Sequence, residues 1–353
     1  MATNPALMEP TVVPAPDAKP EPPFRVFSTC PSSVTNAEDY LDQVIRVARW
    51  SEQAGCLGML IYTDNSLVDP WLIAQIIIQS TRTQSPLVAI QPVYMHPFSV
   101  AKMVATLASL YGRRVFLNMV AGGFKNDLTA LNDRTPHDRR YKRLVEYTLI
   151  VRGLLENAAP LTFEGEFYQV NGLSLHPRIS PKLFPEIFVS GSSEAGRAAA
   201  RAMGAVAVQY PEPPSQGATE MSEGKPSGVR LGIIARADEE EAWRVALGRF
   251  PADRKGQLTH QFALKVSDSE WHKRLSEVGS HLNGRRNTYW LHPFETYKTF
   301  CPYLVGSYET VAAELKGYLA AGHRTYILDI PAAEEEFEHT SMVFRLASQM
   351  VAS

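Results

Sequence analysis

The chain has 353 residues, of which 45% are hydrophobic and 20% are charged, and its formal net charge at pH 7 is −2. These values are ordinary for a globular protein, and the balanced charge excludes the broad electrostatic attraction on which nucleic-acid and acidic-membrane binding depend. The three cysteines are far apart and form no CxxC pair, so we expect a cytoplasmic protein with neither a metal site nor a disulfide framework.

The first 23 residues are rich in proline and contain neither the basic region nor the apolar core of a signal peptide. We therefore expect residues 1–23 to form a disordered leader. Later apolar runs such as "WLIAQIII" are too short to span a bilayer. Residues 24–353 are expected to form one domain, since α/β barrels of this size are commonly single units.

From residue 24 onward, short apolar runs alternate with segments whose apolar residues recur at helical spacing. The runs are continuous, which is typical of parallel strands that are buried on both faces. The predicted strands are residues 24–29, 57–62, 86–91, 114–119, 186–190, 204–210, 229–235 and 324–330. The predicted helices are residues 37–54, 69–80, 97–111, 136–155, 194–203, 238–250, 308–323 and 333–351.

Two segments depart from this alternation. Residues around "EGE" at 164–166 predict a small hairpin, and residues 251–305 fit no βα unit of usual length. Strands that alternate with helices favour a TIM (β/α)8 barrel, with 251–305 as an insertion or lid between the seventh strand and the final barrel unit. A doubly wound open sheet is the alternative. The high strand count and the absence of GxGxxG after the first strand weigh against it.

In a barrel, functional residues lie at the carboxyl ends of the strands. There the sequence places amides and hydroxyls but few acids. No strand end carries the carboxylate pair, Ser–His–Asp set or Schiff-base lysine that a hydrolase or aldolase needs. A polar mouth that is poor in acids suits an organic cofactor that is held by hydrogen bonds and supplies the reactivity.

The turn after the fifth strand contains Ser190, Gly191, Ser192 and Ser193 and leads directly into a helix. Unpaired N–H groups and the helix dipole favour a phosphate at such a position, and Gly191 lets an oxygen approach the backbone. Ser192 or Ser193 can donate to that oxygen. The alternative is that one of these serines only caps the helix, and spacing alone favours the cap.

Three further candidates also have structural alternatives. Asn118 stands in the apolar strand "FLNMV" and either pairs with backbone or offers its amide to a heteroaromatic ring edge. His137 and Tyr141, in "HDRRYKRLVEY", either reach a phosphate or a flavin edge or belong to a solvated basic face. Cys30 has no activating neighbour in the sequence, which favours an inert packing role.

Together these segments resemble the bacterial luciferase-like, flavin-dependent monooxygenases, within them the alkanesulfonate monooxygenase branch. The resemblance extends from Phe24 to about Ala347. Its carriers are "HPFSVAKMVATLASLYGRRVFLNMVAGG", "HDRRYKRLVEYTLIVRGLL", "FEGEFYQVNG", "EIFVSGSSEAGRAAARAMGAVAVQYPEPP", "VRLGIIARADEEEAWR" and "VGSYETVAAELKGYLAAGHRTYIL". It implies a TIM barrel with an insertion, reduced FMN from a separate NAD(P)H-dependent flavin reductase, and a homodimer or homotetramer.

The resemblance also implies residue roles. Ser192 and Ser193 would hold the FMN phosphate with Tyr141 beside them. Asn118 would contact the pyrimidine side of the isoalloxazine, and His137 would lie close to the flavin. Residues 251–305 would form a mobile lid that excludes water from the reaction.

The chain departs from the sulfonate enzymes at several positions. Cys30 and Gly232 stand where they carry histidines, Leu67 stands where they carry a cysteine, and Ile330 replaces a tyrosine. Arg230, two residues before Gly232, is kept. The resemblance thus implies an intact flavin-binding frame without most of the sulfonate-processing set, so a simple alkanesulfonate is not the expected substrate.

The lid's flexible Gly-rich, arginine-containing segment is replaced by "HPFETYKTFCPYL", which leaves Lys298 as the nearest cation. We expect Arg230, with Arg286 or Lys298, to bind an acidic group of the substrate and to stabilise developing charge. Cys30 completes the candidate catalytic set because of its position after the first strand.

The resulting hypothesis is a flavin-dependent monooxygenase. Reduced FMN would react with O2 to give a C4a-(hydro)peroxyflavin that transfers one oxygen to an organic, acid-bearing substrate. Two alternatives remain. One is an oxidoreductase of the same fold that uses the deazaflavin F420 for hydride transfer without O2. The other is a flavin-binding protein that has lost catalysis.

Overall fold

The structure of the protein, a computed structural model, describes residues 24–32, 36–122, 125–191, 193–214, 227–266, 270–282 and 286–352. Eight parallel strands pair in a closed ring, because the last of them, β12, pairs with the first, β1. The strands are β1 (Arg25–Thr29), β2 (Gly58–Ile61), β3 (Ser85–Ile90), β4 (Phe116–Met119), β7 (Ile187–Ser190), β8 (Val206–Gln209), β9 (Ser227–Arg236) and β12 (His323–Leu328). The predicted TIM (β/α)8 barrel is therefore confirmed, and an open sheet is excluded.

Large apolar side chains fill the inside of the barrel. The rings of Phe27 and Phe116 meet edge to face with centroids 5.3 Å apart, and those of Phe27 and Phe188 with centroids 5.4 Å apart. Because successive residues of a strand point to opposite faces, the neighbours of these phenylalanines point outward against the helices. Burial on both faces is why the strands are continuous apolar runs in the sequence.

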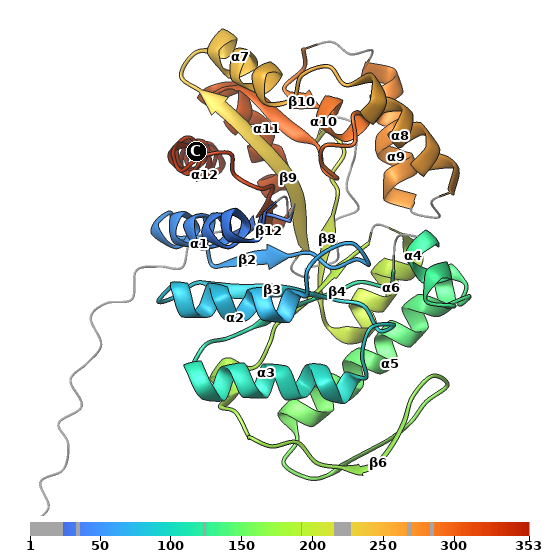
Figure 1. Ribbon diagram of the computed structural model, residues 1–353. Helices are drawn as coiled ribbons and strands as arrows, with labels where there is room; N and C mark the ends of the chain where they lie inside the picture. The colour runs from blue at the N-terminus through green and yellow to red at the C-terminus, as the bar shows by residue number, and fades with distance from the viewer. Residues whose placement is uncertain are drawn as a thin grey trace, which may run out of the picture.

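Helices cover the outer face of the barrel (Figure 1). Local signals set their ends: Asp69 caps α2 by accepting from two backbone N–H groups, and Gly112 ends α3 in the left-handed conformation. Each predicted helix is present. They are α1 (Ala37–Gln53), α2 (Pro70–Ser80), α3 (Pro97–Tyr111), α5 (His137–Glu156), α6 (Glu194–Met203), α7 (Glu239–Arg249), α11 (Tyr308–Ala320) and α12 (Glu335–Ala352). No helix among the described residues is long and apolar enough to cross a membrane.

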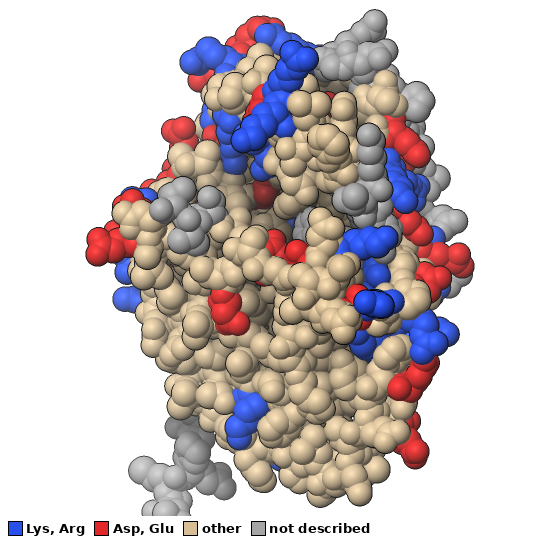
Figure 2. Space-filling view, turned by 45° about the vertical axis from the view of Figure 1, so that its right-hand side comes forward, with Lys and Arg blue, Asp and Glu red and all other residues tan. Residues whose placement is uncertain are grey.

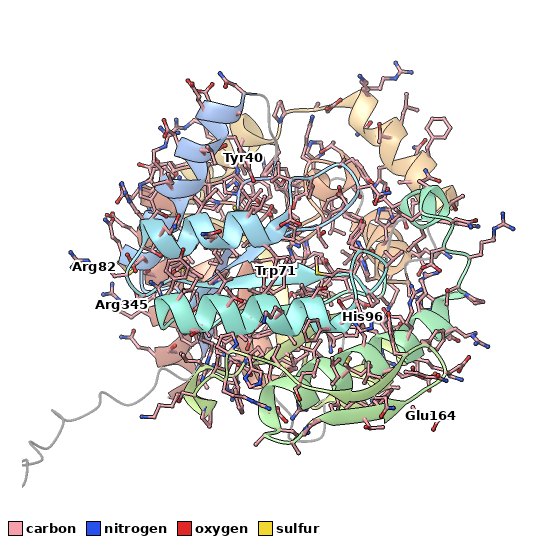
Figure 3. All side chains as sticks on the ribbon, turned by 60° about the horizontal axis from the view of Figure 1, so that its bottom comes forward. Tyr40, Trp71, Arg82, His96, Glu164 and Arg345 are labelled. Carbon is pink, nitrogen blue, oxygen red and sulfur yellow. The ribbon has the colours of Figure 1, made fainter. Side chains whose placement is uncertain are left out.

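The two ends of the barrel differ. Figure 3 shows Arg82, which precedes β3, on the opposite side from His96, which follows β3. On the side of His96 lies the short helix α4 (Lys125–Ala130), which the sequence analysis did not predict because six residues are too few for a periodic signal. The predicted hairpin is present as β5 (Leu161–Glu164) and β6 (Gln169–Leu173), followed by the 3-10 turn η1 (Pro181–Leu183).

The segment between α7 and α11 contains two helices, α8 (Arg254–Val266) and α9 (Glu270–Leu282), which lie side by side at the upper right of Figure 1. After them come β10 (Tyr289–Trp290), α10 (His292–Glu295) and β11 (Tyr303–Ser307). Strand β11 was not predicted. It pairs in parallel with the carboxyl half of β9, from Gly232 to Arg236. The segment is therefore tied to the barrel by a strand, and its motion as a lid stays a prediction.

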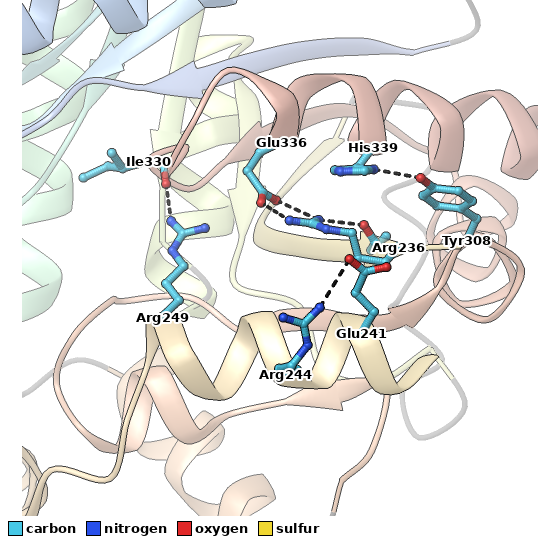
Figure 4. Close-up of polar contacts among 9 residues, drawn as sticks. Arg236, Glu241, Arg244, Arg249, Tyr308, Ile330, Glu336 and His339 are labelled. Atoms are coloured by element: carbon cyan, nitrogen blue, oxygen red, sulfur yellow. Dashed lines mark hydrogen bonds and ion pairs between the residues drawn. The ribbon is translucent and has the colours of Figure 1, made fainter. Parts of the chain in front are cut away.

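A buried ion pair joins the end of β9 to α12. Arg236 pairs with Glu336, and their side chains are only 6% and 9% exposed (Figure 4). On the surface of α7 nearby, Arg244 and Glu241 also pair, but these side chains are 76% and 46% exposed. The two pairs share the same chemistry and differ in their burial.

Replacing Arg236 with glutamine leaves the Glu336 carboxylate buried without its cation. We expect Arg236→Gln to lower the free energy of unfolding by about 3–5 kcal/mol, since breaking a buried pair leaves an uncompensated charge. The matched control Arg244→Gln removes an exposed pair and is expected to cost less than about 1 kcal/mol. Urea unfolding followed by circular dichroism measures both, and equal losses would contradict this assignment.

Candidate active site

A cavity of about 670 Å³ lies at the carboxyl ends of the barrel strands. This volume is within the range of small-molecule and cofactor sites. Its barrel-side wall includes Thr63, Asp64, Gln91, Asn118, Gly122, Lys125, His137, Tyr141, Ser190, Gly191, Ser193, Tyr210 and Arg230. Around the rest of the face that Figure 2 shows, basic and acidic side chains are interspersed without a broad field of one sign. The sequence-predicted position of the site is thus the position of the cavity.

The structure brings the residues that were predicted to contact a cofactor together in this wall. They come from β4, from α5 and from the turn between β7 and α6. They are Asn118, His137, Tyr141, Ser190, Gly191 and Ser193. Ser192, the remaining member of that prediction, lies outside the described residues.

Ser193 caps α6. Its Oγ accepts a hydrogen bond of 3.1 Å from the backbone N–H of Gly196, and the residue is buried. Acting as acceptor for the cap leaves the hydroxyl proton of Ser193 for donation into the cavity. The hydroxyl of Tyr141 lies against the same turn, because a Cβ added to Gly191 would stand 2.6 Å from it. Only glycine at position 191 allows this close approach.

Asn118 and Ser190 stand on the neighbouring strands β4 and β7. The Oδ1 atom of Asn118 accepts a hydrogen bond of 2.9 Å from the hydroxyl of Ser190, which leaves the Asn118 amide nitrogen available as a donor. His137 begins α5. Its Nδ1 lies 2.7 Å from Asp138, and its ring meets that of Tyr141 edge to face at 5.2 Å. This side of the cavity offers hydrogen-bond donors and aromatic surface.

Arg230 is the buried cation of the wall, with 3% of its surface exposed. Its guanidinium lies over the ring of Tyr62 at 4.5 Å and near the ring of Tyr210 at 5.9 Å. Its Nη2 is 3.5 Å from Oδ1 of Asp329. Because this ion pair is long, Arg230 keeps the capacity to bind an anion in the cavity.

Asp329, just beyond β12, has two further partners besides Arg230. Its Oδ2 accepts hydrogen bonds of 2.6 Å from the hydroxyl of Thr299 and 2.7 Å from that of Tyr303. Thr299 precedes β11 and Tyr303 begins it. One carboxylate thus joins the last barrel strand, the inserted segment and the cation of the cavity.

The inserted segment forms the other wall of the cavity. Trp271 of α9 stacks on Tyr210 with ring centroids 3.9 Å apart and an interplanar angle of 14°. Tyr297 also faces the cavity and has a left-handed backbone with φ of 57°. Further members of this wall are Thr259, Phe262, Ala263, Glu270, His272 and Phe300. Two other aromatic residues of the segment, Trp290 and Phe294, are buried. The ring of Trp290 packs against Trp243 of α7, and that of Phe294 packs against His260 and His272.

Three predicted catalytic residues do not line the cavity. Cys30 is buried in the hydrophobic core, and burial raises the pKa of its thiol well above the ordinary value. Arg286 forms an ion pair with Glu240 at 2.8 Å, and Lys298 forms one with Asp253 at 2.6 Å. Both cations are about half exposed. Of the predicted catalytic set, the structure brings only Arg230 to the cavity.

The structure explains the glycine at position 232. A Cβ there would stand 2.3 Å from the ring of Tyr303, so the tyrosine of β11 fills the space that a larger side chain would need. Sequence reasoning missed Tyr303 and Asp329 because it did not predict β11. The position of Asp329 directly after the core of the last strand, in "ILDI", was the one feature of the sequence that could have indicated a residue of the site. Nothing in the sequence placed Trp271 or His272 at the cavity.

A closed parallel barrel with a polar cavity at the carboxyl ends of its strands defines the class of the protein as a TIM-barrel enzyme. The chain belongs to the luciferase-like monooxygenase family, whose model matches residues 24–325. The protein is therefore an oxidoreductase of the monooxygenase type, as the sequence analysis predicted.

Individual proteins are similar over nearly the whole chain. The 4-(gamma-L-glutamylamino)butanoyl-[BtrI acyl-carrier protein] monooxygenase BtrO of Niallia circulans is 33% identical over 313 residues, which is 87% of this chain and 91% of the relative. The EDTA monooxygenase EmoA from Chelativorans sp. BNC1 has a TM-score of 0.72 at 16% identity and covers 93% of this chain and 94% of its own. An F420-dependent secondary alcohol dehydrogenase has a TM-score of 0.65 at 18% identity, over 92% and 99% of the two chains. The two solved structures show the shared fold.

Replacing Gly232 with alanine tests the packing of Tyr303. The added methyl group collides with the ring, so we expect Gly232→Ala to lower the free energy of unfolding by about 1–3 kcal/mol. The control is Gly248→Ala, in α7, where an added Cβ meets nothing within 4 Å. It is expected to raise stability by a few tenths to about 1 kcal/mol, as for glycine in a helix. Chemical denaturation distinguishes the two, and a neutral Gly232→Ala would show that Tyr303 does not occupy this space.

Proposed function

We propose that the protein is a two-component monooxygenase that uses reduced FMN and O2 to place one oxygen atom in an organic, acid-bearing substrate. The observation that carries the proposal is the composition of the cavity. One side presents hydroxyl and amide donors at a helix N-terminus, and the other presents the buried cation Arg230. Among the described residues of the wall, no contact joins a Ser–His–Asp set or a pair of carboxylates, which favours chemistry that a cofactor supplies.

The residues present fit FMN. The turn at Gly191 approaches Tyr141 so closely that any Cβ would fill the space, and the buried Ser193 lies at the amino end of α6. This arrangement suits a phosphate, which would accept from Ser193, Tyr141 and backbone N–H groups, with Ser192 next to them in the chain. When bound, reduced FMN supplies the activation of O2. Asn118 would orient the flavin ring by its amide, and His137 would lie at the ring's edge.

The remaining walls would handle the substrate. Arg230 would bind its acidic group, since a desolvated guanidinium beside a long ion pair attracts a further anion. Trp271, Tyr297 and the other aromatic residues of the inserted segment would cover the reaction and exclude water. Cys30, Arg286 and Lys298 have no assigned step, because they lie away from the cavity wall.

The relatives support an acid-bearing substrate. By their names, BtrO acts on a glutamylaminobutanoyl group carried by a protein, and EmoA acts on EDTA. Both of these molecules contain carboxylates. We extend only this shared feature to the present chain.

We further propose that an NAD(P)H-dependent flavin reductase supplies the reduced FMN and that the protein is a homodimer or homotetramer. The first follows from the family and from the lack of a GxGxxG turn after the first strand. In favour of the second, the neighbouring helices α2 and α3 expose Leu72 and Leu110 to 64% and 70%, and apolar residues exposed on adjoining helices are suited to a subunit interface. Light scattering of the purified protein measures the oligomeric state directly.

A second candidate function is hydride transfer with F420, which the similarity to an F420-dependent dehydrogenase favours. A third is flavin binding without turnover. Calorimetric titration with FMN and with F420 separates the cofactors, and we expect FMN to bind more tightly. Isotope incorporation from labelled O2 into a panel of organic acids, with a flavin reductase and NADH present, tests the reaction. Preferential F420 binding would overturn the proposal, and FMN binding without any labelled product would support the third candidate.

Replacing Ser193 with alanine removes one donor to the phosphate and the cap of α6. We expect FMN affinity to fall about tenfold or more, because a hydrogen bond to a charged group is lost, and stability to fall by about 1 kcal/mol. Ser307 caps α11 through the backbone N–H of Thr310 in the same way but does not line the cavity. Ser307→Ala is therefore expected to reduce stability alone. Equal FMN affinity in the two variants would show that Ser193 caps α6 but does not contact FMN.

A further inference from the structure

The cavity wall contains a histidine that the function described above does not use. His272 lies in the first turn of α9 and lines the cavity beside Trp271. His137 is the other histidine of the wall within the described residues, and it stands on the cofactor side. Among the described residues, no histidine of a barrel strand lines the cavity. The inserted segment thus brings an imidazole to the cavity from a different direction.

The Nδ1 edge of the His272 ring is buried. The residue is only 5% exposed, and its Nδ1 is buried without a hydrogen-bond partner. The other ring nitrogen, Nε2, is not buried without a partner, and His272 lines the cavity, so we infer that the ring meets the cavity through its Nε2 edge. A proton on Nδ1 would be a buried donor without an acceptor, whereas a proton on Nε2 can find an acceptor in the cavity. We therefore assign the proton of the neutral ring to Nε2, which makes His272 a donor toward the cavity.

His260 of α8 holds this ring in place. The two imidazoles are 4.8 Å apart with an interplanar angle of 33°, and the ring of Phe294 packs against both at 4.6 Å and 5.0 Å. Nε2 of His260 is 3.1 Å from the hydroxyl of Ser276, and that hydroxyl donates at 2.8 Å to the backbone carbonyl of His272. Because Ser276 uses its proton there, His260 is the donor to Ser276. The rings of His260 and Phe294, packed against the His272 ring, restrain its orientation.

The surroundings also keep His272 uncharged. Burial, and then the neighbouring His260, lower the pKa of His272 to about 4, and burial lowers the pKa of His260 as well. Above its ordinary pKa of about 6.5 the ring is neutral in the folded and in the unfolded protein, and the folded protein resists protonation down to about pH 4. At neutral pH the cavity therefore contains a charged site at Arg230 and an uncharged donor at His272.

We propose that His272 positions the substrate by donating a hydrogen bond from Nε2 to an uncharged carbonyl oxygen of a substrate whose acidic group binds Arg230. The inference rests on the proposed function and narrows the substrate class to acids that also carry an amide or ester carbonyl. An anion is the wrong partner for His272, since it would draw a proton onto a ring that His260 and the apolar packing hold neutral. A carbonyl oxygen satisfies the donor without any charge.

The two sites lie on connected parts of the cavity. Trp271, next to His272, stacks on Tyr210, and the ring of Tyr210 in turn lies near the guanidinium of Arg230. A substrate that spans from Arg230 to His272 would therefore touch the barrel at one end and the inserted segment at the other. Its carbonyl could form the hydrogen bond with His272 only when the inserted segment lies over the cavity.

Two probes of equal chain length test the proposal: 4-acetamidobutanoate, which has a carboxylate and an amide, and heptanoate, which lacks the amide. Their dissociation constants are measured by calorimetry, with and without oxidised FMN. We expect the ratio of the heptanoate constant to the 4-acetamidobutanoate constant to fall about threefold to tenfold in His272→Phe, as for the loss of one neutral hydrogen bond. His272→Gln keeps an N–H donor and is expected to retain most of the ratio. Arg230→Met should weaken both probes alike.

An unchanged ratio in His272→Phe would overturn the proposal, and so would a wild-type protein that binds neither probe in either condition. Circular dichroism verifies that each variant is folded. If His272→Phe does not fold, the ratio in His272→Leu and in His272→Gln decides instead. The measurement needs neither a reductase nor O2, so its failure is distinguishable from a failure of the monooxygenase reaction. A purely structural role for His272 would alter both dissociation constants together and leave their ratio unchanged.

Discussion

The carboxylate of Asp329 is the contact on which the arrangement of the cavity depends. It accepts hydrogen bonds from Thr299 and Tyr303 and pairs with Arg230, so that the last barrel strand, the inserted segment and the buried cation share one anchor. A buried carboxylate needs several such partners to offset its lost hydration. Because two of them are hydroxyls, part of the charge of Arg230 is left for a ligand. Asp329 therefore connects parts of the fold and also affects the charge of the cavity through Arg230.

The position of β11 follows from this anchor and changes the chemistry of the wall. With Tyr303 against Gly232, strand β9 has no room for a side chain at that point, and the barrel contributes less polar surface to the cavity. The inserted segment compensates with an aromatic stack onto Tyr210 and with His272. The inserted segment thus adds its own residues to those that the barrel strands supply to the cavity wall.

The barrel and the barrel-side wall of the cavity were accessible from the sequence because both depend on local patterns. Strands buried on both faces are continuous apolar runs, and a strand–turn–helix unit places Ser190, Gly191 and Ser193 together whatever surrounds them. The register of parallel strands then brings Asn118 beside Ser190. Arg286 and Lys298 were expected at the cavity because they belong to the segment that resembles a lid. Each instead forms an ion pair with a nearby acid, because short irregular segments leave the direction of a side chain undetermined.

By itself the sequence determined the order of strands and helices, the closed barrel and the glycine- and serine-containing turn before α6, since these follow from periodicity, capping and chain connectivity. The tertiary structure alone decided which residues of the inserted segment face the cavity. Strand β11 is short and its partner, β9, lies more than sixty residues earlier in the chain, so no local pattern reveals their pairing. That pairing fixes Tyr303 and Asp329, and the packing of α8 on α9 fixes His272. Long-range packing, which depends on contacts between distant segments, thus set the wall of the cavity that the inserted segment forms.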